Sequence, residues 1–239
     1  LGSATAVATA FSVASGITFD PVSYILSGAG TFEVTGTVLV PGATFADNYT
    51  IAGAKTINAA STFNYQNTNP TINAGWTYQN LEFSGAGTAG ASGTLDIQGN
   101  LTNTGGGTLN FGNNGVILSG TVAGNNIAGF TTTGTVSMTK TGGTTATLTG
   151  AVNGGGLTIN GAGGTLNLGV GLTHTFTGDV TLTAGTLNAG SSILNANNTS
   201  ATAWNGTGTV FNAGTGTVNF NGANQTLAAT ATTFNILNF

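Results

Sequence analysis

Acid–base chemistry in this chain would depend on a small set of side-chain carboxylates. They are Asp20, Glu33, Asp47, Glu82, Asp96 and Asp179. Cleavage of a polysaccharide needs two such groups about 5–10 Å apart and usually further convergent ionisable groups, yet the basic residues are limited to Lys55 and Lys140. The spacing therefore predicts scattered, solvated acids and a protein that is not an enzyme, with no catalytic residues. A polysaccharide lyase or hydrolase is the least favoured alternative.

Sites for a metal ion or a cofactor are equally sparse. His174 is the single histidine and cysteine is absent, so one chain cannot form a transition-metal site, and we expect His174 to face outward from a strand. Residues 85–90 match G-x-G-x-x-G, but a strand pattern follows them instead of the helix that would hold a pyrophosphate. With a formal net charge of −4 and two basic residues, the chain has little with which to bind nucleic acid. We predict no metal, no cofactor and no nucleic-acid partner.

Two further residue patterns are typical of binding surfaces. Alternating threonines could order water on a flat β face, and aromatic residues could stack on sugars. The threonines are Thr173, Thr175, Thr177, Thr181 and Thr183, and the aromatic residues are Trp76, Tyr78 and Trp204. Because threonine is also a common polar residue on any β face, a glycan- or ice-binding module is an alternative and not the leading prediction.

The composition limits which elements could position such groups. Glycine accounts for 41 of the 239 residues, and each glycine costs about 1 kcal/mol inside a helix. The 39% of hydrophobic residues, including 13 Phe, argue against disorder, which goes with few aromatic residues. No apolar run approaches the roughly 18 residues of a membrane-spanning helix. The sequence therefore predicts an all-β protein without a membrane span.

The strand pattern indicates the architecture. Apolar and polar residues alternate over 94–102, 135–139 and 179–188, which is typical of strands with one buried face, and glycine-rich breaks separate them. Short strands joined by such corners predict a parallel β-solenoid (β-helix), in which like residues of successive coils stack in ladders. The alternative is an antiparallel β-sandwich, a pilin-like subunit with donor-strand exchange, in which residues 1–13 would be the donor strand.

Internal repeats support the solenoid. The segment 61–83 resembles 216–239, and 134–160 is a more divergent copy; the strands at Thr62, Thr135 and Thr217 begin 73 and 82 residues apart. We predict a single continuous repetitive β domain, 1–239, of about three long repeat units of roughly 75–80 residues. The approximate units are 1–61 (partial), 62–134, 135–216 and 217–239 (partial).

The partial units predict where the chain associates. A solenoid normally needs polar capping repeats, and an uncovered strand edge pairs with another chain. We therefore expect head-to-tail stacking of identical subunits, or a tandem array, through residues of the two terminal segments. These predicted assembly edges are Leu1, Ala4, Ala6, Ala8, Phe11, Phe234, Ile236, Leu237 and Phe239.

The strings GTLDIQGNLTNTGGGTLNFG (93–112) and GTGTVNFNGANQTLAATATTFNILNF (214–239) resemble repeats of large secreted bacterial surface proteins of the Bacteroidetes type and of autotransporter passenger domains. The resemblance implies an extracellular, cell-surface location, a β-solenoid and an adhesive or structural role, and it carries no site residues. The expected function is a structural component of an extracellular filament, sheath or adhesin. Its expected partners are further copies of itself and cell-surface glycans.

Overall fold

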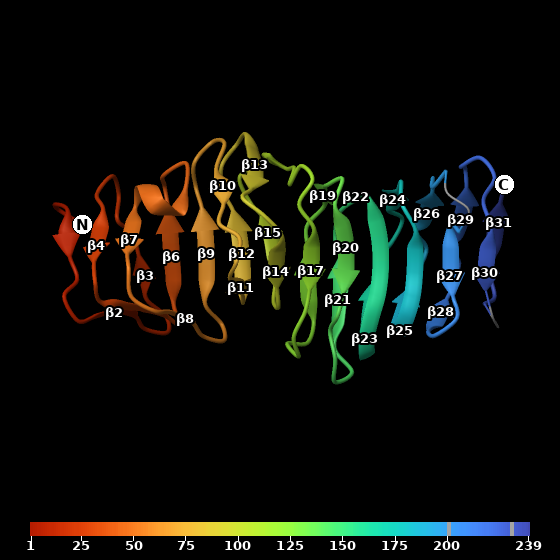
Figure 1. The fold of residues 1–239 in the computed structure, drawn as a ribbon, viewed down its shortest axis with the longest axis horizontal. Helices are drawn as coiled ribbons and strands as arrows, with labels where there is room; N and C mark the ends of the chain where they lie inside the picture. The colour runs from red at the N-terminus through yellow and green to blue at the C-terminus, as the bar shows by residue number, and fades with distance from the viewer. Residues whose placement is uncertain (200–201, 230–231) are drawn as a thin grey trace. The chain divides into compact units, whose positions relative to one another are not determined.

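The computed structural model describes residues 1–199, 202–229 and 232–239, which form two compact units, Leu1–Asn110 and Phe111–Phe239. In both units short strands wind into coils, and each strand pairs in parallel with its equivalent in the neighbouring coil (Figure 1). The described residues make about 11 turns. The prediction of an all-β, parallel β-solenoid is confirmed.

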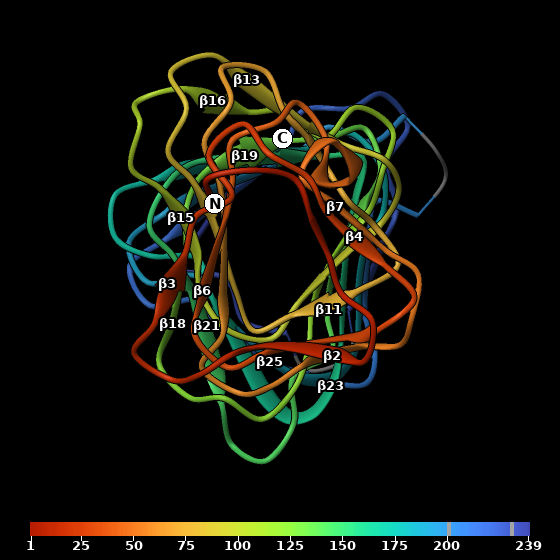
Figure 2. The ribbon, with the colours of Figure 1, turned by 90° about the vertical axis from the view of Figure 1, so that its left-hand side faces the viewer.

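The strands of unit 1 stack in three columns, which lie on different sides of the coil; Figure 2 shows β3, β2 and β4 on three sides of unit 1. The first column is the sheet of β1 (Thr5–Ala6), β4 (Leu26–Gly28) and β7 (Tyr49–Ile51). The second is the sheet of β2 (Ala10–Val13), β5 (Thr31–Val34) and β8 (Lys55–Ile57). The third is β3 (Thr18–Phe19), β6 (Thr37–Val40), β9 (Thr62–Tyr65), β12 (Asn80–Phe83) and β15 (Leu101–Asn103). Further along the unit, β10 (Thr71–Ile72), β13 (Thr88–Ala91) and β16 (Thr108–Leu109) form a separate sheet, and β11 (Thr77–Tyr78) pairs with β14 (Leu95–Ile97). A short 3-10 helix, η1 (Phe45–Asp47), precedes β7.

Alternation of side chains explains this stacking. In the third column Val38, Phe63, Leu81 and Leu101 lie in one register and are all buried. Their sequence neighbours in the next register, Leu39, Asn64, Glu82 and Thr102, are half-buried on the outer side. Each coil thus places an apolar residue above the apolar residue of the coil before, and the interior of unit 1 is a continuous core.

Unit 2 follows the same plan. Its first column is β19 (Phe130–Thr131), β22 (Val152–Gly154), β24 (Thr173–Phe176), β26 (Ile193–Ala196), β29 (Thr217–Phe220) and β31 (Ile236–Asn238). The second is β17 (Val116–Leu118), β20 (Thr135–Met138), β23 (Gly156–Asn167), β25 (Val180–Asn188), β27 (Trp204–Gly206) and β30 (Leu227–Ala229). The third contains β18 (Asn125–Ile127), β21 (Thr145–Leu148), the later parts of β23 and β25, and β28 (Val210–Asn212). The strands β23 and β25 therefore continue round a corner, with register shifts on either side of Asn160.

The structural repeat is shorter than the sequence repeat. Paired residues of adjacent coils are between 18 positions apart, as Thr62 and Asn80 are, and 25 positions apart, as Thr37 and Thr62 are. The predicted units of roughly 75–80 residues each contain several coils. Successive coils differ in sequence, so the period of one coil is hard to recognise in the sequence.

The antiparallel sandwich is wrong for this chain. All the strand pairings described here are parallel, and the antiparallel exception among the described residues is the isolated bridge between Thr141 and Gly163. An antiparallel sheet needs turns that reverse the chain, whereas the corners here bend it onward round the coil. In the described ranges no helix is long and apolar enough to cross a membrane.

Candidate functional site

The first coil of unit 1 has a free side. Its strands β1, β2 and β3 pair with β4, β5 and β6, and within the described residues they have no second partner. We call their free sides the first-coil edge. Unpaired N–H and C=O groups along a strand form a template for another strand, so this edge is a candidate association site.

The predicted residues of this edge have unequal positions. Leu1 and Phe11 are half-buried, and Phe11 stacks on Phe32 with a centroid distance of 5.8 Å. Ala4, Ala6 and Ala8 are exposed, and Val7 between them is buried. The inward side chain of this segment is that of Val7, which the sequence pattern did not single out.

The last coils of unit 2 have a free side as well. In the part of the chain that the structure describes, β28, β30 and β31 pair only with β25, β27 and β29. We call their free sides the last-coil edge. Phe239 is 85% exposed and stacks on the buried Phe220 at 5.8 Å; Ile236 is exposed, and Leu237 and Phe234 are half-buried.

An amide ladder runs up to the last-coil edge. Asn195, Asn219 and Asn238 lie in register on β26, β29 and β31. The Nδ2 of Asn219 donates to Oδ1 of Asn195 at 2.7 Å, and the Nδ2 of Asn238 donates to Oδ1 of Asn219 at 2.8 Å. Since every amide donates in the same direction, Oδ1 of Asn238 is the acceptor that faces onward from the ladder.

Exposed large hydrophobic residues gather near the two edges. Those of unit 1 fall within residues 17–25, and those of unit 2, apart from Val122 and Val170, fall within residues 193–239. They are Ile17, Val22, Tyr24 and Ile25, then Ile193, Val210, Ile236 and Phe239. Apolar surface concentrated in this way is typical of interaction sites.

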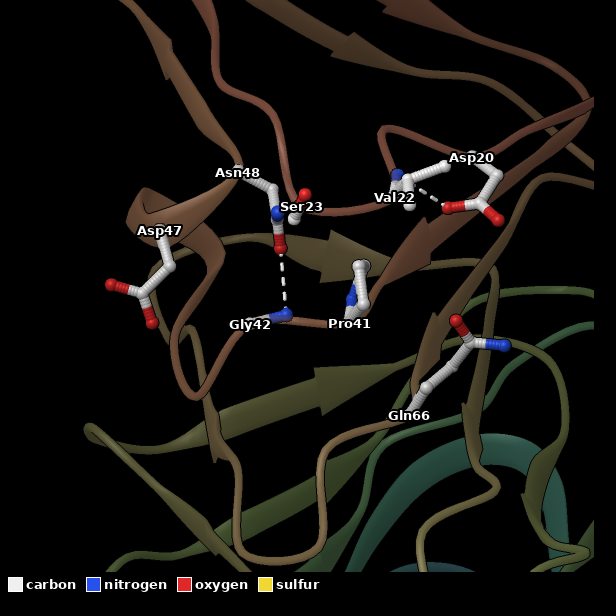
Figure 3. A pocket seen from close by; sticks show the side chains of 8 residues that line it. All are labelled: Asp20, Val22, Ser23, Pro41, Gly42, Asp47, Asn48 and Gln66. Carbon is white, nitrogen blue, oxygen red and sulfur yellow. Dashed lines mark hydrogen bonds between the residues drawn. The ribbon is translucent and has the colours of Figure 1, made fainter. Parts of the chain in front are cut away.

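Two acids of unit 1, Asp20 and Asp47, accept hydrogen bonds from the backbone, whereas Glu33, Glu82 and Asp96 accept them from the side chains of Asn58, Thr104 and Thr77. A hollow of about 500 Å³ is lined by Asp20, Val22, Ser23, Pro41, Gly42, Asp47, Asn48 and Gln66 (Figure 3). Asp20 accepts a hydrogen bond from the Val22 N–H, and Asp47 accepts one from the Thr44 N–H, both at 2.7 Å. In Figure 3 the two carboxylates lie on opposite sides, and that of Asp47 points away from Asp20. The hollow therefore does not bring two carboxylates to one point, and none of the described residues forms a group of three potential metal ligands.

His174 lies in the interior of unit 2. The prediction of an outward-facing residue is wrong, because His174 is fully buried on β24. Its Nδ1 accepts a hydrogen bond from the Val152 N–H at 3.1 Å, and Nε2 lies 2.8 Å from the Leu168 carbonyl oxygen, to which it donates as the neutral tautomer. Alternation supplied the missed signal, since Phe176, two residues later, is a core residue.

This histidine makes stability dependent on pH. Burial lowers the pKa of His174 below its ordinary 6.5, so below that pH the unfolded chain takes up a proton that the folded chain does not. Stability is then complete above about pH 6.5 and decreases as the pH falls toward the lowered pKa, by up to about 1.4 kcal/mol per unit. Urea denaturation between pH 7 and pH 4 measures this slope. In His174→Gln the contribution should vanish, and an unchanged slope would contradict the assignment.

The aromatic residues that were candidates for sugar stacking divide into two kinds. Tyr78 and Trp204 are fully buried, so the surface role considered for them is wrong. The Tyr78 hydroxyl donates to the Asn73 carbonyl at 2.6 Å and lies 3.1 Å from the Tyr65 hydroxyl, and burial raises the pKa of Tyr65 to about 12. Trp76 alone of the three is half-buried and reaches the surface.

The remaining predicted groups lie in strands, in a corner and in the core. Residues 85–87 precede β13 (Thr88–Ala91) and residues 88–90 lie in it, so the G-x-G-x-x-G stretch passes into a strand and not into a helix. In the threonine array, Thr173, Thr177 and Thr183 are exposed, while Thr175 and Thr181 are half-buried. Lys140 is fully buried, and its Nζ donates to the carbonyls of Ser119 at 2.9 Å and Val122 at 3.2 Å.

No family model, curated protein or solved structure matches this chain.

Proposed function

We propose that this chain is a structural, non-catalytic module of an extracellular filament, sheath or cell-surface adhesin, and that it associates end to end with a second copy. The last-coil edge of one copy would pair with the first-coil edge of the next. The observation that carries the proposal is the pair of free strand edges, each continuous with an apolar interior.

Backbone hydrogen bonding between strands favours a second copy of the chain as the partner. A further coil on β31 would satisfy its free N–H and C=O groups, as β31 itself does for β29. It would also cover Ile236 and Phe239, which are 47% and 85% exposed. A donor side chain on the added strand could extend the amide ladder through Oδ1 of Asn238.

The lack of charge supports association and an external location. Only 3% of residues are charged, against about 25% in ordinary globular proteins, so copies would meet with little repulsion of like charges. An ordinary cytosolic protein uses a mixed charged surface to stay unassociated. The resemblance to secreted bacterial surface repeats agrees with an extracellular, cell-surface location.

A pair of variants tests the association. Ile236→Lys puts a charge on the last-coil edge, where burial by a second copy would leave it unpaired, and we expect association to weaken by at least about tenfold. Val170→Lys is the matched control, because Val170 is an 84% exposed aliphatic residue of the same unit outside the edge. Sedimentation velocity and electron microscopy over a range of protein concentrations measure the effect, with circular dichroism to confirm folding.

The parent chain and Val170→Lys should form species that lengthen with concentration, and Ile236→Lys should not. Monodisperse parent particles at every concentration, or equal association of the two variants, would overturn the proposal.

A further inference from the structure

A second hollow of unit 1, of about 250 Å³, brings a tryptophan and a lysine together at the surface. Its lining residues are Lys55, Ile57, Gly75, Trp76 and Thr77. They come from β8, from the corner before β11 and from β11 itself. No part of this hollow belongs to the first-coil edge, so its role is separate from end-to-end association.

The Trp76 ring is held firmly. It packs edge-on against Phe45, with a centroid distance of 4.5 Å and an interplanar angle of 88°, and lies 5.5 Å from Phe63. Trp76 is nevertheless only half-buried. Beside it, Gly75 has a φ of +82°, and apart from Gly75 and its two chain neighbours no atom lies within 4 Å of the position that a Cβ would take. The ring therefore presents a fixed aromatic surface next to open space.

Lys55 supplies the charge. Of the described residues that line the hollow, it alone is charged, and it is exposed, whereas Lys140 is buried. Its Nζ donates to the Ile51 carbonyl at 2.8 Å, which anchors the ammonium group and leaves two of its three N–H donors. The nearby Asp96 is turned to Thr77, whose hydroxyl donates to Oδ2 of Asp96 at 3.0 Å.

The geometry points to a binding site for a carboxylate-bearing sugar, such as a uronic acid residue of an acidic polysaccharide. The apolar face of the ring would lie on Trp76, which buries C–H groups against an aromatic surface, and its carboxylate would accept charge-assisted hydrogen bonds from Lys55. Pockets for drug-sized ligands measure about 300–1,000 Å³, so this smaller hollow suits one sugar ring, with the rest of the polymer outside. The proposal does not depend on self-association.

The test uses a short oligogalacturonate as the probe, with isothermal titration calorimetry and ligand-observed NMR on the intact chain. We expect binding that Lys55→Gln weakens by at least about tenfold, as loss of charge-assisted hydrogen bonds implies, and that Lys55→Arg largely retains. Trp76→Phe should also weaken binding, because a smaller ring covers less of the sugar. Circular dichroism verifies that each variant is folded, and Lys55→Gln, at an exposed position, leaves the core intact.

Two further ligands test the contributions of the sugar ring and of the carboxylate separately. The methyl-esterified oligomer keeps the sugar rings and loses the charge, and acetate keeps the charge and lacks the ring; both should bind much more weakly than the acid. Equal binding of the ester, equal binding of acetate, no binding of the acid, or an unchanged affinity in Lys55→Gln would each overturn the proposal. Since monomeric protein suffices for every arm, failure here is distinguishable from failure of end-to-end association.

Discussion

Replacing Gly99 by alanine is expected to destabilise the protein by at least about 2 kcal/mol, as overpacking of a tight interior does. Gly99 is buried at the corner between β14 and β15, directly above the backbone of the coil before. A Cβ at this position would collide with the carbonyl oxygen of Gln79 and lie 2.6 Å from Oδ1 of Asn80. The colliding atom is backbone, so it can move only if the coils separate.

Gly90→Ala is the matched control in the same unit. Gly90 lies in β13, where an added Cβ would have its nearest neighbours at 3.9 and 4.0 Å, ordinary van der Waals contacts. Its stability should stay within about 1 kcal/mol of the parent chain, because alanine there mainly restricts the unfolded state. Urea denaturation followed by circular dichroism compares the two. Equal losses in both variants would show that the Gly99 corner is not closely stacked.

The same corner shows what the sequence predicts and what it leaves open. The alternation over 94–102 predicts strand, and the structure has two strands there, Leu95–Ile97 and Leu101–Asn103, with Gly99 between them. A corner that keeps the chain moving round the coil leaves the apolar alternation almost unbroken. Local pattern therefore identifies strands and the buried face, but not where the coil turns.

The alternation of inward and outward side chains along a strand also predicts which residues are buried. Val7 and His174 are both buried between residues that face outward. In a polar segment the alternation is hard to recognise, because the buried residue need not be apolar. His174 is buried because the Val152 N–H and the Leu168 carbonyl satisfy both ring nitrogens. Those partners lie in other strands or corners, so no spacing within the segment predicts them. The hollow of Lys55 and Trp76 likewise joins residues from two coils, and only the stacking brings them together.

Trp204→Ala is expected to cost about 3–5 kcal/mol, the range for removing a buried aromatic side chain. Trp204 is fully buried at the start of β27, and it is the centre of the aromatic cluster in unit 2. Its ring centroid lies 5.1 Å from that of Phe211, 5.3 Å from that of Phe234 and 6.2 Å from that of Phe220. Alanine would leave a cavity among these rings, next to the last-coil edge.

Trp204→Phe should be much milder, and the difference has a specific cause. No described residue accepts a hydrogen bond from the buried indole N–H of Trp204, and an unpaired buried donor costs about 1–3 kcal/mol. Phenylalanine removes that donor and keeps an aromatic ring against Phe211 and Phe234, so the gain offsets part of the lost volume. Urea denaturation of both variants by circular dichroism measures the two losses. If Trp204→Phe proved as destabilising as Trp204→Ala, the indole N–H would have to be contributing a hydrogen bond to the core, and the cluster would be held by more than ring packing.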